Sequence, residues 1–166
     1  MLRWMIAVCW VVSGACRGEE APVVEPEMPE TRVVTDAVAE ADALIESLAK
    51  AERLALPQPG EIRALRTALY VRNDKRRVAS LDAAVLSHAR RHGTTQLERE
   101  RSLVSNAFGS HVLAGELDRA RSYREDWLAE VGPGAERTST LETAAATYES
   151  SGYLDEAKAV RARIER

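Results

Sequence analysis

Two short stretches of the chain share one pattern: residues 112–120 (VLAGELDRA) and residues 149–157 (ESSGYLDEA). Both contain Gly-x-Leu-Asp-x-Ala, and the two copies begin 37 residues apart, at Gly115 and Gly152. Glycine permits a tight turn at the end of a helix, and an aspartate is favourable in the first turn of the next one. The small alanine lets two helices approach closely. The pattern therefore predicts two antiparallel helix pairs of similar construction.

The surrounding sequence is also typical of helices. Apolar residues recur at helical spacing through residues 35–166, and we find no convincing strand alternation. Turn signals rich in Gly, Pro and Asn divide this region. The predicted helices span residues 36–54, 61–72, 75–91, 95–114, 117–131, 137–150 and 154–166. The fold class expected from this pattern is all-α.

The second half of the chain resembles the tetratricopeptide repeat, a helix-turn-helix unit of about 34 residues that stacks into a solenoid. The last unit matches the repeat at four positions. Ala145 and Ala157 stand at its two small positions, Tyr148 at its aromatic position and Gly152 at its turn. The preceding unit shares the turn glycine and the following alanine. The resemblance covers residues 95–166 and implies antiparallel helix pairs stacked as a short solenoid that binds proteins or peptides.

The first half is less similar to the repeat. Residues 61–91 have the length of one unit, but Asn73 stands where the glycine is expected. These residues are either degenerate repeats or an unrelated helical cap. The alternative for the whole domain is a compact helical bundle in which the shared pattern arose twice by chance.

The first sixteen residues have the layout of an export signal. Arg3 supplies positive charge, residues 4–12 (WMIAVCWVV) form a short apolar run, and residues 13–15 are small. This run is too short to span a bilayer, which requires about 20 apolar residues. The stretch ending at Cys16 resembles a bacterial lipobox, which implies removal of residues 1–15 and lipidation of Cys16.

One position departs from the lipobox. Ser13 stands where an aliphatic residue is usual, and Ser13 and Ala15 also fit the small-x-small rule of ordinary signal cleavage. Secretion without an anchor therefore remains the alternative to lipidation. In either case Cys16 is the single cysteine of the processed chain, so no internal disulfide is expected.

Residues 17–34 (RGEEAPVVEPEMPETRVV) contain three prolines and five glutamates. Such a composition buries little apolar surface, so we expect a disordered tether. The expected organisation is a signal peptide at 1–15, the lipidated cysteine and an acidic linker at 16–34, and a helical domain at 35–166.

Charge is unevenly distributed along the chain, whose formal net charge is −3. Residues 61–92 contain eight arginines and lysines against three acids, a local excess that could attract an anionic partner or lipid headgroups. We favour a solvated helical face, and nucleic acid is not an expected partner of this net acidic chain. The candidate partner-binding residues are Arg76 and Arg77 from this region, together with Tyr148 and Tyr153.

The sequence contains no recognised catalytic motif, phosphate-binding loop or cysteine pair. His88 and His92 are one helical turn apart, but no nearby residue completes a metal site, so His88, His92 and His111 are interpreted as solvated surface histidines. No metal, cofactor or catalytic residue is expected. The predicted function is an envelope-anchored scaffold or assembly factor on the periplasmic face of a bacterial membrane, binding an unidentified envelope protein or peptide. The alternative is a secreted or envelope helical enzyme with an unrecognised site.

Overall fold

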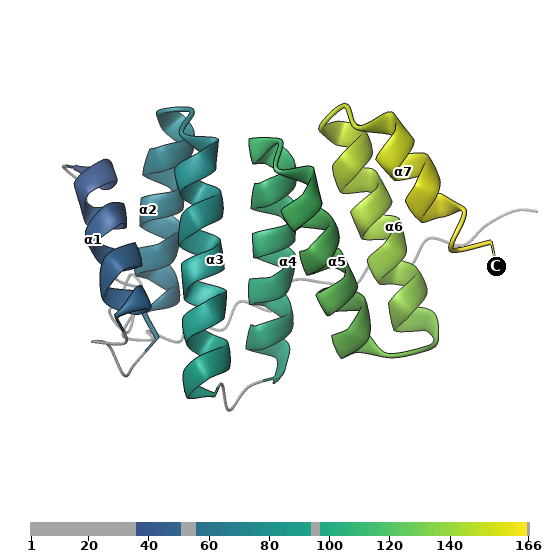
Figure 1. Ribbon diagram of the computed structural model, residues 1–166, viewed down its shortest axis with the longest axis horizontal. Coiled ribbons are helices and arrows are strands. Elements are labelled where there is room, and N and C mark those ends of the chain that lie inside the picture. The colour runs from purple at the N-terminus through teal and green to yellow at the C-terminus, as the bar shows by residue number, and fades with distance from the viewer. Residues whose placement is uncertain (1–35, 51–55, 94–96, 166) are drawn as a thin grey trace, which may run out of the picture. The chain divides into compact units, whose positions relative to one another are not determined.

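The computed structural model describes residues 36–50, 56–93 and 97–165. In these residues the regular structure is entirely α-helical, which confirms the predicted all-α fold class (Figure 1). The described helices are α1 (Ala37–Ala49), α2 (Pro59–Val71), α3 (Lys75–His92), α4 (Leu97–Ala114), α5 (Leu117–Val131), α6 (Ala135–Ser150) and α7 (Leu154–Arg161). The predictions for the signal, Cys16 and the linker lie outside the described residues.

The boundaries differ from expectation at both ends of the domain, where α1 ends at Ala49 and α7 ends at Arg161, and also at the start of α2. The α2 helix begins at Pro59, two residues earlier than predicted, because proline at the first helical position needs no hydrogen-bond partner for its nitrogen. The backbone N–H of Gln58 donates to the carboxylate of Glu61 at 3.1 Å, which caps this end. Pro59 therefore belongs to a turn signal between two predicted helices and also starts the second of them.

Three turns connecting α2 to α3, α4 to α5 and α6 to α7 share one backbone geometry. Each contains a residue with positive φ: Asn73 at 57°, Gly115 at 77° and Gly152 at 86°. The residue that follows has nearly the same φ and ψ in all three turns, between −88° and −90° and between 65° and 66°. Asparagine tolerates the left-handed region better than most residues, so Asn73 takes the place of glycine.

The hydrogen bonds of these turns are also equivalent. In each, the N–H after the positive-φ residue donates at 2.9 Å to the carbonyl five residues earlier, as in a Schellman motif. The carbonyls belong to Leu69, His111 and Tyr148, and all three side chains are fully buried. The first helix pair is therefore built around the same turn as the two pairs that carry the Gly-x-Leu-Asp-x-Ala pattern.

The buried core is divided among three clusters with shared neighbours. One joins α1, α2 and α3, a second lies between α3 and α4, and the third joins α4 to α7. Leu103 packs against the first and second clusters, and Tyr123 and Trp127 pack against the second and third. In the third cluster, the rings of Phe108 and Tyr148 meet edge to face with centroids 5.4 Å apart. Apolar contacts are thus continuous from α1 to α7.

The interpretation of the histidines as surface residues is wrong for two of the three. His88 and His111 are fully buried, whereas His92 is exposed. His111 occupies the buried position four residues before Gly115, and its Nδ1 lies 2.8 Å from the carbonyl oxygen of Ala107. Burial lowers the pKa of His111, so the ring is neutral in the folded chain at neutral pH.

Each described helix packs against the next one along the chain, and α1 also contacts α3. In addition α4 contacts α6, whereas α2 and α4 both pack on α3 without contacting each other through their backbones. This spacing between α2 and α4 creates the site described below. No described helix combines the length and apolar composition that crossing a bilayer requires.

Candidate partner-binding groove

The residues singled out from the sequence lie in different environments. Arg76 is exposed, but the neighbouring Arg77 is engaged with Asp74 and with Asp42 of α1, whose Oδ1 lies 2.8 Å from the Arg77 Nε. Tyr148 is fully buried, as its helical spacing predicts, and Tyr153 is partly buried against the same cluster. The structure does not bring these four residues together into one surface.

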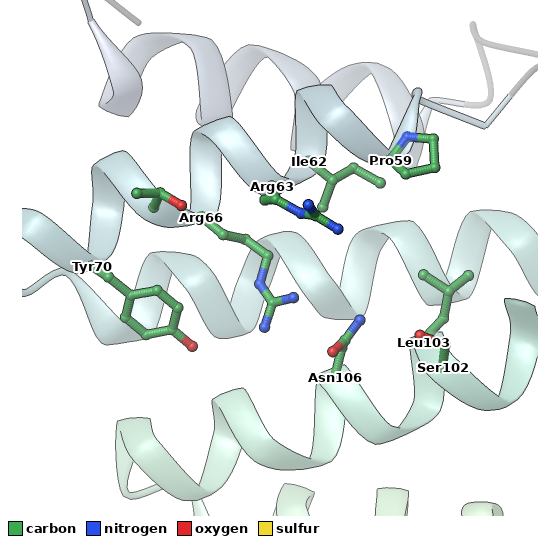
Figure 2. A pocket seen from close by; sticks show the side chains of 9 residues that line it. Pro59, Ile62, Arg63, Arg66, Tyr70, Ser102, Leu103 and Asn106 are labelled. Carbon is green, nitrogen blue, oxygen red and sulfur yellow. The ribbon is translucent and has the colours of Figure 1, made fainter. Parts of the chain in front are cut away.

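A groove lies instead between α2 and α4, with a volume of about 570 Å³. Figure 2 shows the side chains that line it. The lining residues are Pro59, Ile62, Arg63, Arg66, Thr67 and Tyr70 from α2, and Ser102, Leu103 and Asn106 from α4. The groove therefore combines apolar, polar and cationic groups from two helices that are separated in the sequence by α3.

One face of α2 carries large side chains at the groove. Ile62, Arg66 and Tyr70 recur every four residues along α2, so they lie on the same face of the helix, and all three line the groove (Figure 2). Their side chains occupy the space between α2 and α4, whose backbones do not contact each other.

The described side chains that line the groove include two cations and no carboxylate. Arg63 is exposed, and no carboxylate of the described residues lies within ion-pair distance of it. The Arg66 side chain is 25% exposed, and its guanidinium projects into the space between α2 and α4 (Figure 2). The groove surface is therefore positively charged.

Asp82 of α3 lies beneath the groove. Its side chain is only 3% exposed, and its Oδ1 lies 3.4 Å from Nε of Arg66. Burial raises the pKa of Asp82 to about 6, and the charge of Arg66 and the hydroxyl of Ser110 oppose this shift only partly. Its Oδ2 is buried without a hydrogen-bond donor among the described residues. The positive charge of Arg66 therefore offsets only part of the cost of burying the Asp82 carboxylate.

Arginines near two other clefts are more fully paired. Near the cleft between α4 and α6, Arg101 lies 2.5 Å from a carboxylate oxygen of Glu136. Near the cleft between α3 and α5, Arg90 pairs with Asp126 at 2.9 Å and with Glu130 at 3.0 Å. These cations hold helices together, whereas the described residues offer Arg63 no carboxylate within ion-pair distance and offer Arg66 only the buried Asp82.

Ion pairs also link α1, α3, α5 and α7. Arg121 of α5 pairs with Glu156 of α7 at 2.5 Å, and Arg163, which follows α7, pairs with Glu125 of α5 at 2.6 Å. Hydrogen bonds from Arg163, together with the nearby Arg124, lower the pKa of Glu125 to about 2. Much of the charge in these helices therefore stabilises helix packing.

Sequence reasoning included Arg63 and Arg66 only in the general basic excess of residues 61–92. A more specific signal was present: Arg66 lies four residues after Ile62 and four before Tyr70, in the middle of an otherwise apolar and aromatic stripe. No group of three metal-ligating side chains gathers in the described ranges. Comparisons of the chain with family models, curated proteins and solved structures gave no significant match.

Proposed function

We propose that this chain is a non-catalytic, envelope-anchored scaffold whose stacked helix pairs bind a segment of a partner protein. The observation that supports this most directly is the groove between α2 and α4, which exposes apolar and hydrogen-bonding groups together. Clefts with such a mixed lining are suited to binding. The recurrence of one turn geometry in three helix pairs supports a short solenoid of the tetratricopeptide type.

Site-specific crosslinking tests the groove. A photoreactive amino acid is placed in the full chain at Thr67 or Ser102, which line the groove, and in a matched control at Ala129, which is exposed on α5. We expect one defined adduct in envelope membranes from the two groove positions, and its loss when Asn106→Trp fills the groove. Equal adducts from Ala129, or none from the groove, would contradict the proposal.

The anchor is tested separately. Metabolic labelling with a fatty-acid analogue compares the native chain with Cys16→Ala, and both are fractionated into membrane and soluble pools. Label and membrane association that depend on Cys16 support lipidation. A soluble, unlabelled chain that has lost residues 1–15 supports secretion, and retention of residues 1–15 contradicts export.

A further inference from the structure

The guanidinium of Arg66 has N–H donors that the described residues do not use. Its Nε lies near Asp82 but makes no hydrogen bond with the described residues, because the 3.4 Å approach lacks suitable geometry. The two terminal nitrogens also donate no hydrogen bond within the described part of the chain, and they face the groove (Figure 2). A guanidinium offers five N–H donors, so Arg66 retains most of its capacity for an incoming acceptor.

The neighbouring groups fit an extended acidic chain. Arg63 precedes Arg66 by three residues, so one helical turn presents two cations on the same side of α2. Asn106 lies across the groove, and within the described residues its side chain makes no hydrogen bond. Its amide can donate to and accept from a peptide backbone. Ile62 and Leu103 supply apolar surface beside these polar groups.

We propose that the groove between α2 and α4 binds an acidic segment of a partner protein, with Arg63 and Arg66 pairing to its carboxylates and Asp82 competing for Arg66 from below. This inference rests on the proposed binding function and specifies the chemistry of the partner. A carboxylate can accept two parallel hydrogen bonds from an arginine. Asp82 is fixed beneath the groove and partly offsets the positive charge that the partner meets.

The competing role of Asp82 makes the proposal testable in both directions. Removing a groove cation weakens binding of an acidic segment, whereas Asp82→Asn removes the competing negative charge and strengthens it. A site that recognised only apolar groups would respond to neither change. Arg72 and Lys75 provide a matched control, because both are exposed cations outside the groove lining.

The probe is a library of random heptapeptides displayed on phage, selected against the full chain in detergent. We expect the selected peptides to be enriched in Asp and Glu. We expect affinity to fall about tenfold in Arg63→Gln/Arg66→Gln and to rise about threefold in Asp82→Asn. The control Arg72→Gln/Lys75→Gln loses the same charge and should change affinity by less than about twofold. Arg63→Gln alone, at an exposed position, gives an independent test if the double variant does not fold.

The outcomes separate this inference from the proposed function. If the selected peptides lack acidic residues but lose their binding in the Asn106→Trp variant, the acidic specificity is overturned and the binding function remains. Failure to select any peptide that depends on the groove would overturn both. A further variant replaces the five glutamates of residues 17–34 with glutamine. If this variant binds the selected peptide about tenfold more tightly, the chain's own acidic segment occupies the groove, and the proposal of a separate partner protein is overturned.

Discussion

Arg66 Nε and Asp82 Oδ1 lie 3.4 Å apart, and this pair connects the helical core to the groove. Asp82 belongs to α3 and is almost completely buried, while Arg66 extends from α2 into the groove. A buried ion pair of this kind contributes little net stability because desolvation opposes the Coulombic attraction. In the proposed function, the effect of this pair is on the charge of the groove.

The first prediction is that Asp82→Asn stabilises the fold at pH 7. The pKa of Asp82 is about 6 in the folded chain against 3.8 for the ordinary group, so between these values the folded state binds more protons than the unfolded state. Stability due to this residue is present at low pH and is lost as pH rises from about 4 to 6. A shift of two pKa units corresponds to about 3 kcal/mol, so we expect a gain of about 1–3 kcal/mol at pH 7.

Urea unfolding of both proteins at pH 4 and pH 7 measures this effect. The difference in unfolding free energy between Asp82→Asn and the native chain should be larger at pH 7 than at pH 4. Using the difference between the two proteins cancels the titration of the surface ion pairs. A loss of stability at pH 7 would mean that the pair with Arg66 outweighs the cost of burying Asp82.

The second prediction concerns His111 and has the opposite sign. Burial lowers the pKa of His111, so below its ordinary value of 6.5 the unfolded state binds more protons than the folded state. The stability that depends on the neutral ring is present above pH 6.5 and is lost as pH falls through the lowered folded pKa. We expect His111→Gln to lose less stability than the native chain between pH 7 and pH 5. Parallel thermal unfolding curves at these two pH values would check this, and an unchanged slope would contradict it.

The third prediction compares the three equivalent turns. Asn73→Gly should raise the unfolding free energy by about 0.5–1 kcal/mol, because glycine adopts the left-handed φ of 57° without a steric penalty. Gly152→Ala should lower it by about 1 kcal/mol at a φ of 86°. Gly115→Ala should cost more than Gly152→Ala, because its added Cβ would lie 3.2 Å from the hydroxyl of Tyr153.

Chemical denaturation of these three variants ranks the turns. A control is Gly60→Ala in the first turn of α2, where an added Cβ meets nothing within 4 Å and φ is ordinary for a helix. Stabilisation by Gly60→Ala together with destabilisation at the two turn glycines would separate the turn geometry from general glycine flexibility. If Gly60→Ala had the same effect as the two turn substitutions, the positive φ of the turns would not be the cause of the destabilisation.

Much of the fold follows from local sequence signals. The α5 helix spans residues 117–131 as predicted, because Gly115 and the Gly132-Pro133-Gly134 stretch mark both ends. The turn at Asn73 was also expected, although its equivalence to the glycine turns was not, since asparagine at that position gives no distinctive pattern. The short-range signals of turns and apolar spacing are sufficient where a helix is bounded by glycine or proline.

The groove was not predictable by the same reasoning. Whether Arg66 faces solvent or a buried carboxylate depends on the packing of α2 on α3, which residue spacing alone does not determine. The burial of His88 and His111 has the same origin, because a histidine on an apolar face is buried only when another helix covers it. The groove and the burial of these two histidines therefore both depend on how the helices pack, which the sequence pattern did not reveal.

The fourth prediction distinguishes a core residue from a groove residue. Tyr148 is fully buried against Phe108, so Tyr148→Leu should lower the unfolding free energy by about 2–3 kcal/mol through lost packing. Tyr70 is 36% exposed and lines the groove, so Tyr70→Leu should change stability by less than about 0.5 kcal/mol.

The effects on crosslinking should be the reverse of those on stability. Tyr70→Leu should reduce the groove crosslink from Ser102, whereas folded Tyr148→Leu should retain it. Paired unfolding and crosslinking measurements check both variants. If Tyr148→Leu folded normally but lost the crosslink, Tyr148 would affect partner binding as the sequence predicted. Because Tyr148 is buried, it would do so by setting the position of α6.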